Sequence, residues 1–316
     1  MKIVTVTLNP CIDKTFSVDR VAADRKLAGH DVHVYPGGGG INVARAVTRL
    51  GVEAQALWSC GGDVGRHLTR LLDAEQVPHV PVPIDGEVRE NLIVFDESSR
   101  EQYRFGMPGP RFSQADRARW LEAVQSVAPS VEFVVFSGSL PDAEPGDWYQ
   151  ELLRAVRSGT RIIVDTAGVA LRRALDSGVF LIKPNQRELG EVVGRELVRE
   201  TEIEEVAREI VAAGGAEVVV VSLGRGGAVC ASKDGVARFL APAVLARSKV
   251  GAGDSMVAGL TAGLTQRRSL EDAVRFGVAA GSAAVMNEGT ELCRREDAER
   301  LYQHLLRHDA SPPRMS

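Results

Sequence analysis

Cysteine is scarce in this chain of 316 residues, and its four cysteines never occur in C-x-x-C spacing. Cys11, Cys60, Cys230 and Cys293 lie far apart, which argues against a zinc knuckle and against a disulfide framework. An excess of positive charge is also absent, since 38 Lys and Arg residues face 42 Asp and Glu residues. The resulting net charge of −4 offers no electrostatic footprint for nucleic acid.

Long apolar segments are absent as well. The N-terminal run Ile3–Leu8 is too short for the core of a signal peptide, and it leads directly into the polar residues Asn9 and Asp13. No later apolar run has the length of a membrane-spanning helix. Because 44% of the residues are hydrophobic, the chain can still build a large core. We expect a cytoplasmic protein with reduced thiols and no membrane partner.

The sequence does contain a regular succession of short Val- and Ile-rich runs, separated by segments with helical periodicity. Such runs are typical of parallel strands that are buried on both faces. Their alternation with helices predicts an α/β fold, a doubly wound, mostly parallel sheet in one domain that spans residues 1–316. The predicted strands are Ile3–Leu8, Ala54–Trp58, Phe133–Phe136, Ile162–Val164, Phe180–Ile182 and Val218–Val221.

Two segments depart from this rhythm. Residues 14–35 and 88–106 alternate polar and apolar residues with a period of about two. The pattern predicts a small, half-exposed antiparallel β lid, in which the second segment folds into a hairpin around Asp96–Arg100. Residues 309–316, which include Pro312 and Pro313, are expected to form a disordered tail.

Polar or small residues follow almost every predicted strand. In an open α/β sheet, ligands bind beyond the carboxyl ends of the strands. Any one of these residues alone would be interpreted as the start of a loop or as a helix cap. Five groups together favour a binding site at this edge of the sheet. The groups are Asn9 with Asp13, Ser137–Ser139, Asp165, Lys183–Asn185 and Ser222–Gly224.

A run of four glycines, Gly37–Gly40, leads through Asn42 into the predicted helix Val43–Leu50. Glycine lets the backbone approach a ligand, and the start of a helix presents free N–H groups to an anion or a hydroxyl. A flexible surface loop would have the same composition. Neither G-x-G-x-x-G nor G-x-x-x-x-G-K-[ST] occurs, so dinucleotide and P-loop sites lack their usual support.

The segment Val250–Ser255 is a sharper signal, because it places Gly251, Ala252, Gly253 and Asp254 at the head of the predicted helix Met256–Thr265. Successive backbone N–H groups there would stabilise negative charge on a phosphoryl group during transfer. An Asp residue that served only as a helix cap would not require glycine on both sides of Ala252. The pattern therefore favours a functional turn.

The segments Pro36–Ala46 and Val250–Ser255 resemble the two signatures of the ribokinase-like, or PfkB, carbohydrate kinases. Between them, Lys183–Glu188 resembles the N-x-x-E magnesium motif of that family. The resemblance covers nearly the whole chain and implies a ribokinase-like fold. Three further segments are similar to the minor bacterial 6-phosphofructokinases of the family: Gln102–Phe105, Ser137–Pro141 and Val274–Ala284.

This resemblance implies ATP-dependent phosphorylation of fructose 6-phosphate at its 1-hydroxyl, which yields fructose 1,6-bisphosphate and ADP. Asp254 would accept the hydroxyl proton, and the amides of Gly251, Ala252 and Gly253 would hold the transferring group. The resemblance also implies two kinds of metal site. Magnesium would be bound by Asn185, Glu188 and Asp165, and a potassium-type cation by Ser248, Val250, Ala284, Asn287 and Gly289.

The same resemblance divides the substrate residues into two groups. The nucleotide would be bound by Lys183, Asn185, Ser222, Gly224, Gly227, Ser248 and Ser282. The sugar phosphate would be bound by Asp13, Lys26, Gly38, Gly39, Asn42, Arg89, Arg104 and Ser139. Within the second group the cations Lys26, Arg89 and Arg104 are needed, because burying a phosphate dianion without partners is prohibitive.

The lid hairpin allows a geometric test of that subsite. Symmetric pairing about Ser98 would place Arg104 opposite Leu92, and therefore on the other face of the sheet from Arg89. A shared phosphate site requires both side chains on one face. We therefore predict a hairpin loop of even length, about two or four residues, or else a β-bulge.

Two alternative functions remain open. The related 1-phosphofructokinases and tagatose-6-phosphate kinases usually carry a lysine in the glycine run where this chain has Gly39, which favours the 6-phosphate substrate. A sugar-phosphate sensor that binds without transferring phosphate is an alternative from another class. Lid sheets in this family often pair across a dimer, which would cover exposed strand edges, so we expect a homodimer.

Overall fold

The structure is a computed structural model that describes residues 2–127, 131–141, 144–156 and 159–309. Most of the predicted tail, residues 310–316, lies outside the described residues. In the described part, the main sheet has the strand order β13-β12-β11-β10-β9-β8-β1-β4-β5. The seven strands from β11 to β5 in this spatial order run parallel to one another. At the other edge, β12 and β13 are added in antiparallel orientation. The predicted doubly wound, mostly parallel sheet is confirmed.

All six strands predicted from the Val- and Ile-rich runs form in this sheet. Sequence reasoning had not assigned β5, β12 and β13. The strand bounds are β1 Ile3–Thr7, β4 Ala54–Cys60, β5 His79–Pro83, β8 Phe133–Ser137, β9 Arg161–Asp165, β10 Val179–Ile182, β11 Ala216–Ser222, β12 Ala228–Ser232 and β13 Gly235–Phe239.

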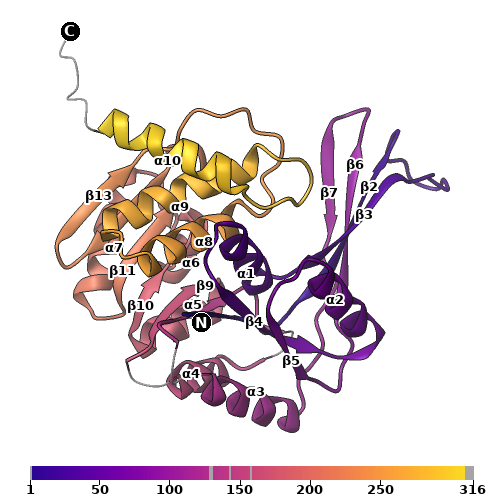
Figure 1. Cartoon of the computed structure of the whole chain (residues 1–316), viewed down its shortest axis with the longest axis horizontal. Coiled ribbons are helices and arrows are strands. Elements are labelled where there is room, and N and C mark those ends of the chain that lie inside the picture. The colour runs from indigo at the N-terminus through magenta and orange to yellow at the C-terminus, as the bar shows by residue number, and fades with distance from the viewer. Residues whose placement is uncertain (1, 128–130, 142–143, 157–158, 310–316) are drawn as a thin grey trace.

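Helices cover both faces of the main sheet (Figure 1). Alternate strand residues therefore belong to two separate hydrophobic clusters: Ile3 faces one and Val4 the other. The first cluster includes side chains of α1 Gly39–Arg49, α2 Gly62–Ala74, α8 Ala252–Thr265, α9 Leu270–Val285 and α10 Arg295–Asp309. The second includes those of α3 Gln114–Ser126, α4 Gly146–Ala155, α5 Gly168–Ser177, α6 Gln186–Val193 and α7 Glu200–Ala212.

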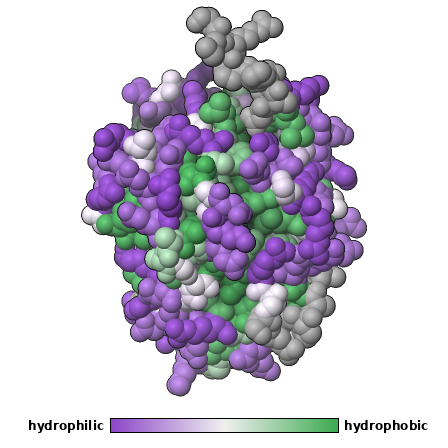
Figure 2. Space-filling view, turned by 90° about the vertical axis from the view of Figure 1, so that its left-hand side faces the viewer, coloured by the Kyte–Doolittle hydropathy of each residue, from purple (hydrophilic) through white to green (hydrophobic). Residues whose placement is uncertain are grey.

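The free edge of the sheet at β13 is flanked by α7 and α9. Figure 2 views the molecule from this side, where hydrophilic residues cover most of the face and hydrophobic residues show between them. None of the helices in the described part of the chain is long and apolar enough to cross a membrane.

A second, smaller sheet has the strand order β3-β2-β6-β7 and is called the lid sheet below. Its strands are β2 Cys11–Val18, β3 His30–Gly37, β6 Arg89–Asp96 and β7 Glu101–Phe105. The two hairpins are antiparallel, and β2 and β6 join them as a parallel pair. Figure 1 shows this sheet standing out from the body of the molecule beside α2.

The lid hairpin has the loop length that the phosphate site requires. Asp96 pairs with Glu101, which leaves a four-residue loop, 97–100, and Arg104 pairs with Ile93. Ile93 lies four positions after Arg89 on the same strand, so the two side chains share a face of the sheet. Arg104, as the partner of Ile93, lies on that face as well. The predicted even loop is confirmed.

The tip of the lid sheet is tied together by the carboxylate of Asp96, which is only 3% exposed. It accepts hydrogen bonds from the Val21 N–H at 2.9 Å, from the N–H and hydroxyl of Ser98 at 2.9 and 2.7 Å, and from the Ser99 N–H at 3.2 Å. These bonds, that of Val21 first, lower the pKa of Asp96 to about 2. The loops after β2 and β6 are therefore held in one arrangement.

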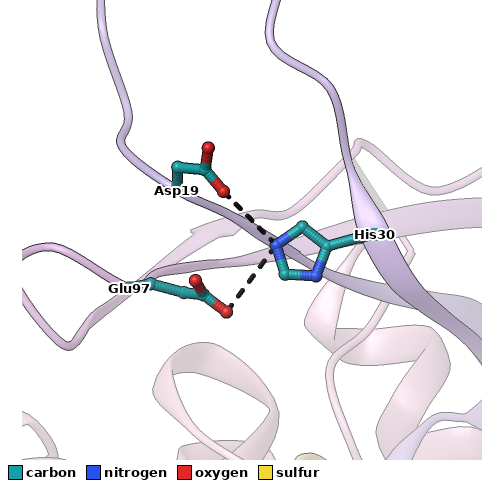
Figure 3. A group of neighbouring side chains, drawn as sticks. All are labelled: Asp19, His30 and Glu97. Carbon is teal, nitrogen blue, oxygen red and sulfur yellow. Dashed lines mark ion pairs between the residues drawn. The ribbon is translucent and has the colours of Figure 1, made fainter.

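His30, at the start of β3, lies between two carboxylates of this tip (Figure 3). Its Nε2 atom is 3.7 Å from Asp19 Oδ1 and 3.6 Å from Glu97 Oε1. On the other side of the ring, Nδ1 is 3.1 Å from Asp31 Oδ2. The hydrogen bond with Asp31, reinforced by the surrounding carboxylates, raises the pKa of His30. When it is protonated, His30 links three segments of the lid tip through these carboxylates.

Candidate active site

Polar side chains meet at the carboxyl ends of β8, β9 and β10, as the sequence predicted. The Asp165 carboxylate accepts a hydrogen bond from the Ser137 hydroxyl at 3.3 Å and forms an ion pair with Lys183 Nζ at 3.0 Å. The Asp165 carbonyl accepts from the Gly138 N–H at 3.0 Å. Three strand ends are therefore joined into one polar edge.

The ion pair between Lys183 and Asp165 is buried, with side chains that are 5% and 13% exposed. Burial alone would lower the pKa of Lys183, but the neighbouring Asp165 carboxylate more than offsets this and the pKa is raised. A Cβ atom added to Gly253 would lie 3.8 Å from Lys183 Nζ. A fixed positive charge therefore lies beside the head of α8.

Helix α8 begins earlier than the sequence predicted, at Ala252 rather than at Met256. Its N-cap residue is Gly251, whose φ of 73° lies in the left-handed region that glycine adopts without strain. The first helical hydrogen bond runs from the Ser255 N–H to the Gly251 carbonyl at 2.8 Å. The N–H groups of the residues between them face out of the helix start, where an anion would be stabilised.

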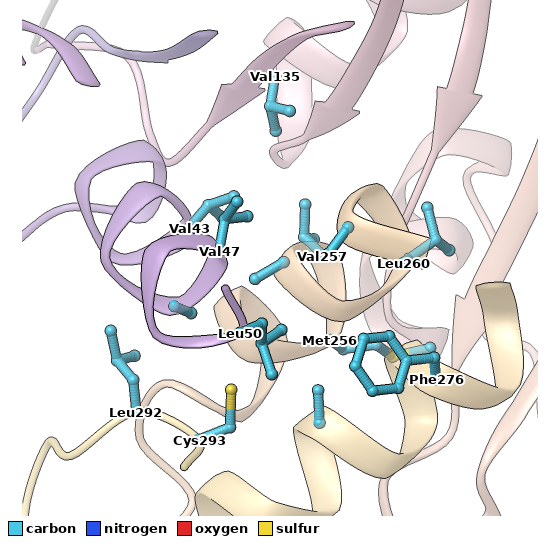
Figure 4. Close-up of a cluster of buried hydrophobic side chains, with 14 of the residues drawn as sticks. Val43, Val47, Leu50, Val135, Met256, Val257, Leu260, Phe276, Leu292 and Cys293 are labelled. Atoms are coloured by element: carbon cyan, nitrogen blue, oxygen red, sulfur yellow. The ribbon is translucent and has the colours of Figure 1, made fainter. Parts of the chain in front are cut away.

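Asp254 lies in this first turn, next to the start of α1. Packing between the two helices explains the proximity, because Val43 and Val47 of α1 lie beside Val257 of α8 in the core (Figure 4). The Asn42 Nδ2 group donates a hydrogen bond to Asp254 Oδ2 at 2.9 Å. Two residues that are far apart in the sequence, and that the resemblance assigned to one site, are therefore in contact.

The electrostatic surroundings of Asp254 make it a stronger base than an ordinary aspartate. Burial of the carboxyl group, which is only partly exposed, and the neighbouring carboxylates of Asp165 and Asp13 raise its pKa to about 6. The hydrogen bond from Asn42 and the charge of Lys183 act in the opposite direction. The carboxylate is thus ionised at neutral pH and close to the range in which a general base is effective.

Behind Asn42 lies a charged pair that sequence reasoning missed. Arg45 donates to Asn42 Oδ1 at 3.1 Å and to the Pro36 carbonyl at 2.9 Å. It also forms two bonds with the Glu75 carboxylate, at 2.8 and 2.5 Å. One signal could have revealed it: Arg45 is the single charged residue within the apolar segment Val43–Val47 of an amphipathic helix.

The glycine run brings the head of α1 against the strand ends. A Cβ atom at Gly39 would lie 2.5 Å from Ser137 Oγ and 2.6 Å from the Gly138 N atom, which is closer than real Cβ contacts. Gly38 has a φ of 109°, which other residues rarely adopt. Helix α1 starts at Gly39, not at the predicted Val43. These glycines are therefore needed for packing, whether or not they also contact a ligand.

One face of the lid sheet looks onto the head of α8. Asp13 and Arg89 share this face by register, and Asn91, which sequence reasoning missed, donates to Asp13 Oδ1 at 3.0 Å. Asp13 is close enough to Asp254 to raise its pKa. Arg89 is held by hydrogen bonds to the carbonyls of Met107 at 3.1 Å and Asn9 at 3.4 Å.

The remaining side chains predicted to bind the sugar phosphate, those of Arg104, Lys26 and Ser139, are exposed. Arg104 is exposed on the same lid face, with its Nε–H donating to Gln102 Oε1 at 3.3 Å. Lys26 is exposed in the loop between β2 and β3. Ser139 is exposed and accepts a hydrogen bond from Asn9 Nδ2 at 3.1 Å.

Asn185 and Glu188 form a capping box at the start of α6. The Asn185 N–H donates to Glu188 Oε2 and the Glu188 N–H donates to Asn185 Oδ1, each at 2.9 Å. Sequence reasoning had weighed only a surface polar pair against a magnesium role for them. Burial and the Asp165 carboxylate raise the pKa of Glu188. The Asp165 and Glu188 carboxylates both act on one buried lysine, Lys183. Carboxylate and amide oxygens such as those of Asp165, Glu188 and Asn185 are the ligands that Mg²⁺ prefers.

Three of the predicted nucleotide residues, Ser222, Gly224 and Gly227, lie at the end of β11 and in the turn that follows it. Ser222 pairs with Asn185, and the Leu223 N–H donates to the Gly227 carbonyl at 2.9 Å, which closes the glycine turn after Gly224. A pocket extends from Asn185, Ser222 and Leu223 over α6. Ser282 is buried on α9, so its side chain is not on an open surface.

The loops assigned to a monovalent cation also come together. Ser248 Oγ donates to the Gly289 carbonyl at 2.6 Å and accepts from the Val250 N–H at 3.2 Å. The Asn287 side chain donates to the Leu292 carbonyl, and the Ala284 carbonyl accepts from the Asn287 N–H. Among the described residues, the buried hydroxyl oxygen of Thr290 has no hydrogen-bond partner. The loops therefore bring several carbonyl and hydroxyl oxygen atoms into one region, the ligand types that hard cations prefer.

Comparisons with known proteins agree on one relationship. The profile of the pfkB family carbohydrate kinases matches residues 6–297. The ATP-dependent 6-phosphofructokinase isozyme 2 of Escherichia coli is 43% identical over 309 residues, which cover 97% of this chain and 100% of the relative. A 1-phosphofructokinase of Bacillus subtilis is 34% identical over 293 residues, which cover 92% of this chain and 95% of the relative.

Solved structures show the same relationship. The crystal structure of phosphofructokinase-2 from E. coli in complex with potassium has a TM-score of 0.93 and 42% identity, and the match covers 96% of this chain and 99% of that one. The crystal structure of the same enzyme in complex with fructose-6-phosphate has a TM-score of 0.91 and 41% identity, with the same coverage.

Proposed function

The chain belongs to the pfkB family of carbohydrate kinases, and from this premise we propose that it transfers the terminal phosphoryl group of ATP to the 1-hydroxyl of fructose 6-phosphate. The products are fructose 1,6-bisphosphate and ADP. The observation that carries the proposal is the contact between Asn42 and Asp254, which joins the heads of two glycine-started helices beside Lys183. This is the arrangement that a phosphoryl transfer needs.

Asp254 acts as the general base. The 1-hydroxyl oxygen attacks the γ-phosphorus of ATP and its proton passes to the Asp254 carboxylate, while the bond to the β-phosphate oxygen breaks and ADP leaves. A pKa of about 6 keeps Asp254 ionised at neutral pH and still basic enough to take the proton. Activity should therefore fall as the pH drops below about 6, because a protonated carboxyl cannot accept the proton.

The negative charge that develops on the phosphoryl group during transfer is stabilised by groups that the fold holds in place. The amides of Gly251, Ala252 and Gly253 at the head of α8 and the ammonium of Lys183 surround the position that this group would take. Such groups need no reorientation during the reaction, so they stabilise the transition state more than water does. Catalysis in this site is therefore mainly positioning and electrostatic stabilisation.

Asn185, Glu188 and Asp165 hold Mg²⁺ in this proposal. The ion neutralises part of the negative charge of the nucleotide phosphates when it is bound. Glu188 uses Oε2 in the capping box, which leaves its other carboxylate oxygen for the ion or its waters. Ser222, Gly224, Gly227 and Ser248 bind the nucleotide. The loops at Ser248, Val250, Ala284, Asn287 and Gly289 hold a monovalent cation, a proposal supported by the potassium complex of the E. coli relative.

The lid sheet supplies the sugar-phosphate subsite. Asp13 and Asn42 bind the sugar hydroxyls, together with the backbone at Gly38 and Gly39 and the hydroxyl of Ser139. Arg89 and Arg104, which share one face of the sheet, bind the 6-phosphate with Lys26. The E. coli relative in complex with fructose-6-phosphate supports this choice of substrate.

Arg104→Met is expected to raise KM for fructose 6-phosphate about tenfold and to leave kcat within about threefold, because it removes a phosphate contact without touching the reacting atoms. Steady-state kinetics at saturating ATP measure both constants. Lys14→Met is the matched control, since Lys14 is a cation on the opposite face of the lid sheet. Equal KM values for the two variants would exclude Arg104 from the subsite.

A substrate panel tests the proposed function. ADP release is measured with fructose 6-phosphate, fructose 1-phosphate and tagatose 6-phosphate side by side, at equal enzyme concentration. We expect the highest kcat/KM with fructose 6-phosphate. A far higher value with fructose 1-phosphate would instead make the protein a 1-phosphofructokinase, and ligand binding without ADP release would indicate a sugar-phosphate sensor.

The homodimer is proposed through the lid sheet. Large apolar side chains such as Tyr103 and Phe105 on β7 are 36% and 48% exposed, and β7 and β3 are the edge strands of this sheet. Exposed edges and apolar residues of this kind are usually covered by a partner.

Sedimentation at micromolar concentration should show a dimer, and Phe105→Lys should shift it toward monomer. Wild-type protein that sediments only as a monomer would contradict the proposal.

A further inference from the structure

Arg45 is a charged side chain on the buried side of α1. It is only 2% exposed, and the residues on either side of it in the sequence, Val43, Ala44, Ala46 and Val47, belong to the hydrophobic core. Removing a guanidinium from water is costly unless it is paired and hydrogen-bonded. The bonds to Glu75, Pro36 and Asn42 meet this requirement. The hydrogen-bond network therefore extends from the partly exposed Glu75 carboxylate, through Arg45, to Asn42, which contacts Asp254.

The chemistry of these groups determines which way the Asn42 amide points. A guanidinium can only donate hydrogen bonds and an ionised carboxylate can only accept them. Asn42 must therefore present its oxygen to Arg45 and its NH₂ group to Asp254, as the structure has it. In the reversed orientation, the Asn42 NH₂ group would face the Arg45 guanidinium, which is also a donor, and the Asn42 oxygen would face the Asp254 carboxylate, which is also an acceptor. Without Arg45, only the unfavourable contact with Asp254 would oppose the reversed orientation.

We propose that Arg45 is a positioning residue for phosphoryl transfer, which acts by fixing the Asn42 amide so that Asn42 holds Asp254 Oδ2 and Asp254 Oδ1 is left to receive the hydroxyl proton. This inference rests on the proposed function and adds Glu75 and Arg45 to it as the support of the base. Glu75 binds two nitrogen atoms of the guanidinium and so sets its plane.

The inference predicts a shift in the pH dependence of activity. The charged groups that act on Asp254 are Asp165 and Asp13, which raise its pKa, and Lys183, which lowers it together with the Asn42 hydrogen bond. The Cys11 thiol also lies near, and burial keeps its pKa well above the usual value, so it stays neutral. When the Asn42 amide can turn, Asp254 loses a donor. Its pKa should then rise above about 6.

Arg45→Met and Arg49→Met form a matched pair for the experiment. Arg49 lies one turn further along the same helix and reaches the same Glu75 carboxylate, at 3.7 Å, but it does not contact Asn42. For Arg45→Met we expect kcat at pH 7 to fall about tenfold or more, the acidic limb of the kcat profile to move to higher pH, and KM for ATP to stay within about twofold. Arg49→Met should match the wild type. Superimposable pH profiles for the two variants would overturn the proposal.

A double variant separates positioning from a structural role. If Arg45 acts through Asn42, then Arg45→Met added to Asn42→Ala should cost almost nothing further in kcat, whereas independent roles would multiply the losses. Should Arg45→Met fail to fold, Glu75→Gln is the substitute, because Glu75 is 29% exposed and its change weakens only one end of the network. It should move the acidic limb in the same direction by a smaller amount, and an unmoved limb would count against the proposal.

Failure of the proposed function remains distinguishable from failure of this inference. Wild-type protein that does not phosphorylate fructose 6-phosphate would contradict the function. The carboxyl ¹³C resonance of Asp254 can be titrated by NMR in wild type and in Arg45→Met without any substrate. An equal midpoint in both proteins would overturn the positioning role even then, and a higher midpoint in the variant would support it.

Discussion

Asp254→Asn is expected to lower kcat about 10³-fold while nucleotide binding is kept. The amide has nearly the shape of the carboxylate, and its oxygen can still accept the hydrogen bond from Asn42. It cannot take the hydroxyl proton, so the attack on the γ-phosphate loses its base. Loss of a negative charge at the head of α8 should not weaken ATP binding, because the phosphates carry the same sign. ADP release measures kcat, and calorimetry measures the Kd for ATP.

Asp272→Asn is the matched control for this variant. Asp272 has the same position in α9 that Asp254 has in α8, the third residue after the N-cap, and it pairs with Arg275 at 2.9 Å outside the site. Its removal should leave kcat within about twofold. An Asp254→Asn variant that retained more than a tenth of the wild-type kcat would show that another group serves as the base.

The raised pKa of Asp254 also has a consequence for stability. Because the pKa in the folded protein, about 6, lies above the usual 3.8, the folded state binds more protons than the unfolded state between these values. Stability contributed by this group is therefore complete below about pH 4 and is lost as the pH rises through about 6. Asp254→Asn should accordingly raise Tm at pH 7.5, and the difference should vanish in acid, as thermal unfolding at both pH values would show.

The second large effect is expected from Lys183→Met. Removing one partner of a buried ion pair leaves the other charge uncompensated, which costs about 3 kcal/mol of the free energy of unfolding. The Asp165 carboxylate would be that uncompensated charge, since its side chain is only 13% exposed. The variant also loses the ammonium beside the head of α8, so kcat should fall by about 10²-fold. Denaturant unfolding and ADP release measure the two effects separately.

Two control variants show whether the effects of Lys183→Met come from the buried ion pair. Lys14→Met breaks the surface pair with Glu90, whose side chains are 37% and 35% exposed, and should cost less than about 1 kcal/mol. The double variant Lys183→Met/Asp165→Asn removes both charges and should recover part of the stability. It should not recover kcat, because it lacks both the ammonium at the head of α8 and a proposed Mg²⁺ ligand. If it recovered activity as well, neither of these two charges would be needed for phosphoryl transfer.

Local patterns in the sequence predicted most of the fold. Buried Val- and Ile-rich runs placed six of the strands, because a parallel strand covered on both faces needs apolar residues at every position. The start of α3 also depends on a local pattern, since Ser113 and Asp116 form a capping box there. The starts of α1 and α8 were predicted too late, because their N-cap residues, Gly38 and Gly251, have no side chain that signals a cap.

Residues that meet across the sheets could not be predicted in the same way. Asn91 contacts Asp13 only because β2 and β6 pair in one particular register, and Glu75 contacts Arg45 although 30 positions separate them. For Asn185 and Glu188, the sequence did not reveal that they close a capping box. The same oxygen-bearing residues at the same spacing can cap a helix or bind a metal.

The order of residues along this chain determines the strands, the two glycine-started helices and, through motif resemblance, the kinase family, because each depends on groups that lie close together in the chain. Tertiary structure decides the rest. It brings Asn42 to Asp254, places Arg89 and Arg104 on one face, and sets the pKa of Asp254. These properties depend on distances and burial between segments, and only packing of the folded chain establishes those distances.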